Sequence, residues 1–378
     1  MSPKPYHILF ISSFGDISWG GQKSLFYLVS NLDRKVFTPH VALPRPGSLR
    51  DRLEDVTIDH RVLNFPKIIT LRFDQVFNAI NELYRFCKTN RIDLIHTDGP
   101  RNAFYGGIVA KLKKIPMIWH IRASNRDRYD RLLYQLSSKI ILVAQVLRRR
   151  FQWVKTEDKF VTIYNGIDLS EFRNENCYRS IRKQYGIGDE ELLISVAARV
   201  ERLKGQKFLI EACGKLRPRL SNYRILIAGE ITEPAYKKEC QEMAAVYGIK
   251  DRIIFPGHVE NFAHIMNATD IFVLPSLLEA FPRAIIEAMG AGKPVVATDV
   301  GGCAEAVENE FSGFIVPPEN ASALADVLLK LGKDKQLRED IGRAARIRAE
   351  KMFTIEENVR QTEKVYHELL AGGQDVIT

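Results

Sequence analysis

The stretch from Leu274 to Gly302 constrains the fold more than any other part of the chain. It opens at the end of a short apolar run, Ile271 to Leu274, which is typical of a buried parallel strand. Pro282 stands where a helix would begin, and proline suits that position because its missing N–H is not needed there. Gly290 predicts the end of this helix, and Val295 to Thr298 the next strand. The stretch therefore predicts the strand–loop–helix–strand unit of an open α/β sheet.

Two glutamates occupy special places in this unit. Glu279 falls in the loop at the carboxyl end of the first strand, and Glu287 lies more than one turn into the helix. Open parallel sheets bind their ligands at this edge. Helix N-termini there favour anions, whereas carboxylates accept charge-assisted hydrogen bonds from sugar or ribose hydroxyls. The pattern predicts a site for a ligand that is rich in hydroxyl groups.

The residues around the two glutamates resemble the signature of glycosyltransferase family 4. Pro275-Ser276 precedes Glu279, and Gly-x-Pro-Val-Val-Ala-Thr followed by Gly301-Gly302 comes after Glu287. Members of this family are retaining, nucleotide-sugar-dependent enzymes of the GT-B fold. The resemblance implies an α/β protein with two Rossmann-like β/α/β domains, whose parallel sheets face a central cleft.

The length of 378 residues also favours two domains. We expect an acceptor-side domain over residues 1–168, a linker over 169–190 and a nucleotide-sugar donor domain over 191–352. A last helix, at about 353–370, carries Ile355, Val359, Val365 and Leu369 on spacings compatible with one face. In GT-B proteins such a helix returns to the first domain.

A basic loop follows the predicted strand from Leu192 to Ala197. Its sequence resembles the family's Gly-Arg-x-x-x-x-Lys-Gly loop, with Ala198 in place of the first glycine. Arg199 offers a planar fork for phosphate oxygens and Lys204 a compact charge. The resemblance implies that both hold the donor diphosphate, whereas Arg202 is expected to be solvated.

The same resemblance places further residues at the donor. Glu287 would hold the ribose hydroxyls, and Glu279 the hydroxyls of the transferred sugar. The family pattern commonly has glycine where Pro282 stands, which leaves the sugar specificity open. The other donor-binding residues implied are His258 and Val259, near the nucleotide base, and Ala280 and Phe281, beside Glu279.

The first half of the chain offers weaker signals. Gly20 and Gly21 end a glycine-rich turn between a strand and a helix, and the resemblance implies that they approach the diphosphate or the acceptor; a simple tight turn is the alternative. His120 ends the predicted strand from Pro116, and in the family a histidine here lies beside the transferred sugar. A core histidine bonded to backbone is the alternative for His120, and the favoured interpretation for His96.

The expected mechanism uses no metal. The chain has no Asp-x-Asp motif that would indicate a metal on the diphosphate. Arg199, Lys204 and helix N-termini would stabilise the charge of the departing nucleotide instead. The predicted catalytic residues are His120, Arg199, Lys204 and Glu279. The family mechanism is front-face attack by the acceptor, with the leaving phosphate taking its proton.

The net charge of +9 leaves several partner classes open. Basic residues cluster in the first half, so an anionic membrane surface is a candidate partner, whereas no nucleic-acid motif accompanies the charge. No apolar run approaches a membrane span, the start of the chain does not resemble a signal peptide, and five scattered cysteines fit a reducing cytosol. A cytoplasmic protein, at most peripheral on the inner membrane face, is expected. The clustered basic residues are Lys111, Lys113, Lys114, Arg122, Arg126, Arg128, Arg131, Arg148, Arg149 and Arg150.

The sequence thus predicts a retaining hexosyltransferase that uses a nucleotide diphosphate sugar. Its acceptor hydroxyl would belong to a cell-surface polysaccharide or a lipid-linked glycan precursor. Two alternatives stay open: a non-catalytic subunit that binds nucleotide sugars, and a GT-B epimerase or hydrolase of nucleotide sugars.

Overall fold

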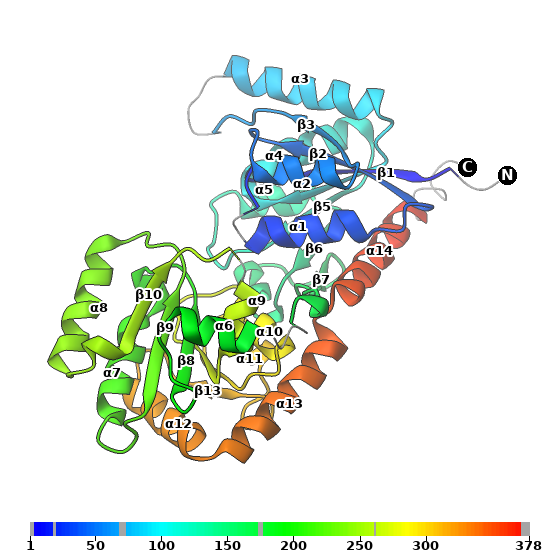
Figure 1. Ribbon diagram of the computed structural model, residues 1–378. Helices are drawn as coiled ribbons and strands as arrows, with labels where there is room; N and C mark the ends of the chain where they lie inside the picture. Colours follow the sequence, from blue (N-terminus) through cyan, green and yellow to red (C-terminus); the bar gives the residue numbers. More distant parts are fainter. Residues whose placement is uncertain (1–3, 18–19, 68–72, 173–176, 261, 372–378) are drawn as a thin grey trace. The chain divides into compact units, whose positions relative to one another are not determined.

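The computed structural model of the chain describes residues 4–17, 20–67, 73–172, 177–260 and 262–371. It divides into two compact units, residues 1–166 with 355–378 and residues 167–354. Each unit contains one open sheet of parallel strands flanked by helices (Figure 1). No helix in the described ranges is long and apolar enough to cross a membrane.

The sheet of the first unit has the strand order β3-β2-β1-β4-β5-β6-β7. Its strands are β1 (Tyr6–Ile11), β2 (Phe37–Leu43), β3 (Asp59–Val62), β4 (Leu94–Asp98), β5 (Met117–Ile121), β6 (Lys139–Leu142) and β7 (Phe160–Thr162). The helices of this unit are α1 (Gly20–Asn31), α2 (Ser48–Asp55), α3 (Phe73–Thr89), α4 (Gly99–Lys113), α5 (Asp130–Leu136), the 3-10 helix η2 (Gln145–Phe151) and α14 (Ile355–Ala371).

The sheet of the second unit has the order β10-β9-β8-β11-β12-β13. Its strands are β8 (Leu192–Ala197), β9 (Tyr223–Ala228), β10 (Ile253–Gly257), β11 (Ile271–Leu274), β12 (Val295–Thr298) and β13 (Phe314–Val316). Its α-helices are α6 (Cys177–Gln184), α7 (Gln206–Leu216), α8 (Pro234–Val246), α9 (Phe262–Ala268), α10 (Arg283–Gly290), α11 (Cys303–Ala306), α12 (Ala321–Lys333) and α13 (Lys335–Met352), and its 3-10 helices are η3 (Leu169–Phe172), η4 (Arg202–Lys204) and η5 (Lys250–Arg252).

The strand order reverses once in each sheet. The reversal lies between β1 and β4 in the first unit and between β8 and β11 in the second. Loops at the carboxyl ends of two such strands leave in opposite directions and open a crevice, which is where open α/β sheets bind ligands. The α/β class and the two Rossmann-like sheets predicted from the sequence are confirmed.

The last helix, α14, belongs to the first unit although 188 residues of the second unit precede it in the chain. Its predicted apolar face is buried: Ile355, Val359 and Val365 join the core of the first unit. Tyr366, which the pattern did not single out, is completely buried beside them. Figure 1 shows α14 beside α1, and the two helices are in contact.

The segment predicted as a linker, residues 169–190, is part of the second unit. Its helix α6 packs against α9, and the guanidinium of Arg182, almost fully buried, donates to the carbonyl oxygens of Ala268 and Gly188 and to the carboxylate of Asp270. The prediction of a linker rested on the many charged residues of this segment. One of them instead ties it to the unit through buried hydrogen bonds.

Two elements of the first unit had no clear signal in the sequence. Strand β3 consists of Asp-His-Arg-Val and is mostly exposed. It lies at the edge of the sheet beside β2, and three of its four residues are exposed. Helix α2 buries only Leu49 and Leu53. Short elements at a margin lack the periodic apolar residues by which a pattern is detected.

Candidate functional site

The loops that follow β8 and β11 meet at the reversal point of the second sheet. Lys204 comes from the first loop and Glu279 from the second, and Nζ of Lys204 lies 2.7 Å from Oε1 of Glu279. Both side chains are largely buried, with 17% and 10% of their surfaces exposed. The hydroxyl of Ser276 donates to the same carboxylate oxygen at 2.7 Å. A cation and a carboxylate from neighbouring strands are therefore joined at the predicted ligand edge.

Glycines allow these two loops, and the loop after β12, to approach one another closely. A Cβ on Gly205 would lie 2.0 Å from the carbonyl oxygen of Pro275, and one on Gly301 would lie 2.0 Å from that of Glu279. Both glycines have positive φ, 64° and 54°. The site thus needs glycine at both positions for space as well as for backbone conformation.

Arg199 lies in the loop after β8 and is tied to its surroundings from two directions. Its Nη2 atom lies 2.9 Å from Oε1 of Glu201, a carboxylate that is 10% exposed. Its carbonyl oxygen accepts a 2.7 Å hydrogen bond from the side-chain amide of Gln206. The amide oxygen of Gln206 is buried and has no hydrogen-bond partner in the described part of the chain. Arg202, in contrast, lies exposed and pairs with Glu239, as expected for a solvated residue.

Glu287 lies in the second turn of α10, and its carboxylate is 3.3 Å from the guanidinium of Arg283 one turn earlier. Pro282 stands immediately before the helix rather than at its first position. The side chain of Phe281 is buried and packs against Phe353, with ring centroids 5.6 Å apart. The carbonyl oxygen of Ala280 accepts from the N–H of Gly302. Phe281 thus anchors the loop through its side chain, and Ala280 through its backbone carbonyl.

His258 and Val259 follow β10, at the far edge of the second sheet. His258 is exposed, whereas Val259 packs against a small apolar cluster that includes Leu226 and Ile265. Two strand spacings, about 10 Å, separate β10 from β8. The residues predicted for the base and for the diphosphate therefore lie along one edge of one sheet.

The crevice of the first sheet is lined by hydrogen-bonded polar groups. The carboxylate of Asp98, at the end of β4, accepts from Ser13 at 2.7 Å, from Asn102 at 2.9 Å and from Gln22 at 3.4 Å. Burial raises the pKa of Asp98 above its ordinary value, against the lowering effect of these donors. Gly20 begins α1, and Cα of its neighbour Gly21 faces the side chain of Arg122. Residues 18 and 19 of the predicted glycine-rich turn lie outside the described residues.

His120, near the end of β5, is buried in the same unit. Its Nδ1 atom lies 3.1 Å from Nε2 of His96 and 3.3 Å from Nη2 of Arg122. Its Nε2 atom is buried and has no hydrogen-bond partner among the described residues. Burial lowers the pKa of His120 well below the ordinary value, and Arg122 and His96 lower it further. His120 is therefore a neutral ring with one nitrogen unused.

His96 is a core histidine, yet it is bound to His120 rather than to backbone. Its Nδ1 atom lies 2.6 Å from the hydroxyl oxygen of Tyr366. Burial, with a smaller effect of Arg122, lowers the pKa of His96 to about 3. Burial also raises the pKa of Tyr366 well above its ordinary value. The three side chains are neutral and form one chain of contacts.

The structure thus assembles Arg199, Lys204 and Glu279 in the second unit, with Glu287 on the helix that follows. His120 and the two glycines lie in the first unit. Several residues at these sites were not predicted: Glu201, Gln206, Ser276, Asp98 and Tyr366. Glu201, Gln206 and Ser276 had a usable signal, since each is a polar residue within three positions of a predicted one. Tyr366 had none.

Much of the basic cluster in the first unit is engaged internally. Arg150 forms a buried two-pronged pair with Asp130, and Arg148 pairs with Glu157 and donates to three carbonyl oxygens. Lys111, near the end of α4, is exposed. These arginines act mainly as structural ties.

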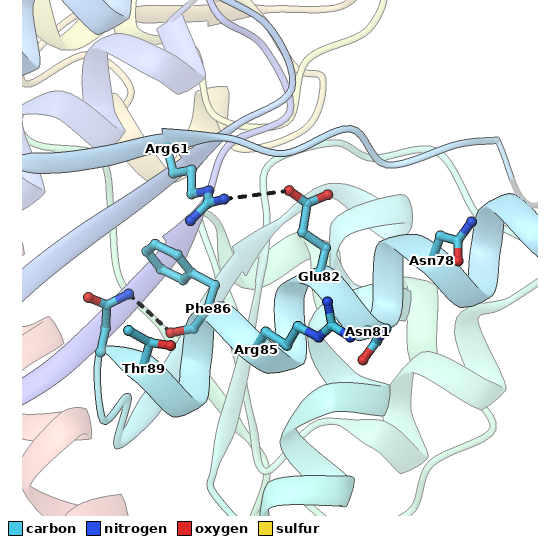
Figure 2. A pocket seen from close by; sticks show the side chains of 8 residues that line it. Arg61, Asn78, Asn81, Glu82, Arg85, Phe86 and Thr89 are labelled. Carbon is cyan, nitrogen blue, oxygen red and sulfur yellow. Dashed lines mark hydrogen bonds and ion pairs between the residues drawn. The ribbon is translucent and has the colours of Figure 1, made fainter.

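The first unit also has a hollow that shares no lining residue with the crevice of its sheet. Figure 2 shows it between β3 and α3, with Arg61 facing Glu82 at 4.0 Å. Most of its lining side chains are exposed polar groups, and Phe86 is buried beneath them. None of the predicted site residues belongs to it.

Comparison with known protein families gives two matches that follow each other along the chain. Residues 20–171 match the profile described as Glycosyltransferase Family 4, and residues 178–348 match that described as Glycosyl transferases group 1. Together the two profiles cover most of the chain.

Individual proteins show the same likeness. The lipopolysaccharide core biosynthesis mannosyltransferase LpsB of Rhizobium meliloti is 30% identical over 212 residues, 55% of this chain and 60% of that protein. The Escherichia coli UDP-Gal:alpha-D-GlcNAc-diphosphoundecaprenol alpha-1,3-galactosyltransferase is 24% identical over 81% of this chain and 83% of its own length. The Anabaena protein HepE, solved with UDP and glucose, superposes with a TM-score of 0.83 at 24% identity, covering 96% of this chain and 99% of that one. The last likeness concerns the fold alone.

Proposed function

The chain belongs to the family 4, group 1 glycosyltransferases and has their GT-B fold, and from this premise we propose that it is a retaining hexosyltransferase with a nucleotide diphosphate sugar as donor. The observation that carries the proposal is the meeting of Lys204 with Glu279 at the reversal point of the second sheet. A cation for phosphate and a carboxylate for hydroxyls are what a sugar diphosphate requires side by side.

The donor would lie along the carboxyl edge of the second sheet. Its diphosphate would take Lys204 and Arg199, and its sugar hydroxyls would take Glu279. Since Lys204 and Glu279 already neutralise each other, the diphosphate would draw Lys204 away and leave the carboxylate free to accept from hydroxyls. Glu287 would hold the ribose, and backbone groups at His258 and Val259 the base.

We expect the reaction to need no metal. Two cations would stabilise the negative charge that develops on the leaving diphosphate. The acceptor hydroxyl would attack from the face that the diphosphate leaves, and its proton would pass to the departing phosphate oxygen. We assign to His120 a hydrogen bond to a sugar hydroxyl, on the strength of the family resemblance.

The acceptor is proposed from the relatives. LpsB is named for the lipopolysaccharide core, and the E. coli enzyme for a sugar on diphosphoundecaprenol. We extend these classes to a cell-surface polysaccharide or a lipid-linked glycan precursor. Such an acceptor would bring the protein to the inner face of the cytoplasmic membrane, where exposed Lys111 and Lys114, around exposed Leu112, would face anionic lipid.

The donor is tested by thermal shift with UDP-, GDP- and ADP-sugars, each with Mg²⁺ and with EDTA. Ligand binding to the folded state must raise the melting temperature. We expect a shift with the sugars of one nucleotide, equal in Mg²⁺ and EDTA, lost in Arg199→Ala and kept in Arg202→Ala. Equal shifts in both arginine variants would contradict the assignment of this crevice.

Product analysis separates the three classes of function. A transferase forms a glycosylated lipid acceptor whose anomeric configuration, read by NMR, matches that of the donor. Conversion of the donor without acceptor would favour the epimerase or hydrolase. Donor binding without turnover on undecaprenyl-diphosphate-linked sugars and lipopolysaccharide core acceptors would favour the non-catalytic subunit.

A further inference from the structure

Tyr366, His96 and His120 form a series of contacts, named here the relay, which joins three elements of the first unit. Tyr366 lies on α14, His96 on β4 and His120 on β5. The links measure 2.6 Å and 3.1 Å, and all three side chains are buried. Phe10 stacks on the ring of His96 with centroids 5.2 Å apart, and Tyr366 packs edge-on against Phe37. These apolar rings offer no hydrogen-bond partners, so the three polar side chains bond to one another.

The direction of the hydrogen bonds in the relay follows from the groups at its two ends, the hydroxyl of Tyr366 and the guanidinium of Arg122. The hydroxyl of Tyr366 has no acceptor other than Nδ1 of His96 in the described residues, so it must donate there. A neutral His96 then carries its proton on Nε2 and donates to Nδ1 of His120. At the other end, Arg122 faces the same Nδ1 atom at 3.3 Å, and a guanidinium can only donate.

The opposite direction would fail at both ends. It would leave the buried hydroxyl proton of Tyr366 without an acceptor. It would also place an N–H of His120 against the N–H groups of Arg122. Buried donors without acceptors are costly, so the two neutral rings have one satisfactory arrangement.

This arrangement decides what His120 can do. With Nδ1 accepting, the proton of the neutral ring must lie on Nε2, the buried atom that has no partner. Buried polar atoms in folded proteins nearly always have partners, and the exceptions call for an explanation. A substrate oxygen that accepts from this N–H would supply the missing partner.

We propose that His96 and Tyr366 are positioning residues that hold His120 in its Nε2–H form, so that His120 presents a fixed, uncharged hydrogen-bond donor to a substrate oxygen. The proposal rests on the proposed function, since it takes that oxygen to belong to a sugar hydroxyl. The last helix of the chain would thereby act on the site through two side chains, without touching the substrate.

The low pKa values of both histidines agree with this arrangement. Burial and Arg122 lower the pKa of each ring. The charged and titratable groups that face the pair are Arg122, Tyr366 and, beyond Arg122, Asp98. An uncharged donor would keep its strength across the neutral pH range, whereas an ordinary histidine would gain a charge near pH 6.5.

Three variants test the role. Tyr366→Phe removes the hydroxyl and keeps the ring between Phe10 and Phe37. His96→Leu combined with Tyr366→Phe removes the whole relay without leaving a buried hydroxyl unpaired. His96→Gln keeps it, because an amide accepts from Tyr366 through its oxygen and donates to His120 through its nitrogen. Urea unfolding identifies any variant that has merely lost stability.

The first measurement needs no substrate. Long-range ¹⁵N–¹H spectra of histidine-labelled protein show which ring nitrogen carries the proton, and comparison with His96→Gln and His120→Gln assigns the two rings. We expect His120 as Nε2–H in the wild type, and a mixture of both forms in the double variant. His120 protonated on Nδ1 in the wild type, or unchanged in the double variant, would overturn the proposal.

The second measurement is sugar transfer. We expect kcat/KM to fall about 10-fold or more in the double variant, and His96→Gln to keep most of the wild-type value. Wild-type kcat/KM in the double variant would refute the role. If no variant, the wild type included, transfers sugar, the proposed function fails while the spectra still decide whether the relay exists.

Discussion

The two reversal points are built alike in topology and differently in chemistry. In the second unit, the loops after β8 and β11 bring together charged pairs, Lys204 with Glu279 and Arg199 with Glu201. In the first unit, the strands next to the reversal point carry the neutral rings of His96 and His120, held by a tyrosine. The first of these groups is ionic and its members can exchange partners, whereas the histidine pair is uncharged and fixed in orientation, although Asp98 and Arg122 lie near it.

The difference matches two kinds of ligand group. A diphosphate arrives with its own negative charge, so cations that are already paired with carboxylates can exchange partners when it binds. A sugar hydroxyl brings no charge, so a buried donor for it must be oriented in advance. The comparison therefore predicts that loss of charge dominates in the second unit and loss of orientation in the first.

The largest effect should come from the cations of the second unit. Lys204→Ala or Arg199→Ala removes a donor that acts on developing charge, and we expect kcat/KM to fall about 10²–10³-fold, or about 2.7–4 kcal/mol. Initial rates with the donor identified by thermal shift measure it. Arg202→Ala, which alters an exposed pair with Glu239, is the matched control and should change the rate little. Equal losses of kcat/KM in all three variants would contradict a specific role of Lys204 and Arg199 in the site.

A smaller effect is expected at Glu287. Glu287→Gln keeps the shape of the side chain and removes the charge from its hydrogen bonds to the ribose, which lowers donor affinity about 10-fold. Titration of the variant with the nucleoside diphosphate alone measures this affinity. The exposed carboxylate of Glu242, on α8, provides the control variant Glu242→Gln. Unchanged affinity would show that the carboxylate of Glu287 pairs with Arg283 and does not bind the ribose.

The neutral relay predicts a loss of stability in acid. The unfolded chain protonates His96 below pH 6.5, whereas the folded chain does so only near pH 3, so the free energy of unfolding falls as the pH drops between these values. At pH 5.5 the loss from His96 is about 1.4 kcal/mol. Urea unfolding at pH 7.5 and 5.5 should show a smaller loss in His96→Gln than in the wild type. An equal loss would mean that His96 is not neutral.

The smallest effect concerns the outer surface of the first unit. Lys111→Ala or Lys114→Ala should weaken binding to vesicles that contain anionic lipid by about 1 kcal/mol each, if these lysines face the membrane. Co-sedimentation at low and at physiological salt measures it, with Lys238→Ala on α8 as the control. If the wild-type protein does not co-sediment with anionic vesicles, this surface is not a membrane contact.

The parts of the fold and site that could be predicted share one property: their signal is local. The apolar run Ile271–Leu274 predicts a strand, and the positions of Glu279 and Glu287 on either side of Pro282 place one carboxylate in the loop at the strand end and the other in the helix that follows. The apolar face of α14 was visible for the same reason. Edge strand β3 was not, because it lacks the burial that produces an apolar pattern.

The relay had no such signal, because Tyr366 and His96 are separated by 270 positions in the chain. Nothing close to either residue distinguishes it from an ordinary core residue, and His96 was expected to be one. The partner of Lys204 was hidden likewise: the sequence predicted a ligand for this cation, and the fold supplied Glu279, 75 positions away. Glu201, the partner of Arg199, stands only two positions from it in the same loop.

By itself the sequence determined which strands and loops form and which residue types stand at their ends, because burial and backbone conformation act over a few neighbouring positions. Only the tertiary structure decided which of those residues meet and which way their hydrogen bonds run. The proton position on His120 is the clearest case. It depends on a hydroxyl and a guanidinium brought to the two ends of a buried chain, where every polar group must find its partner.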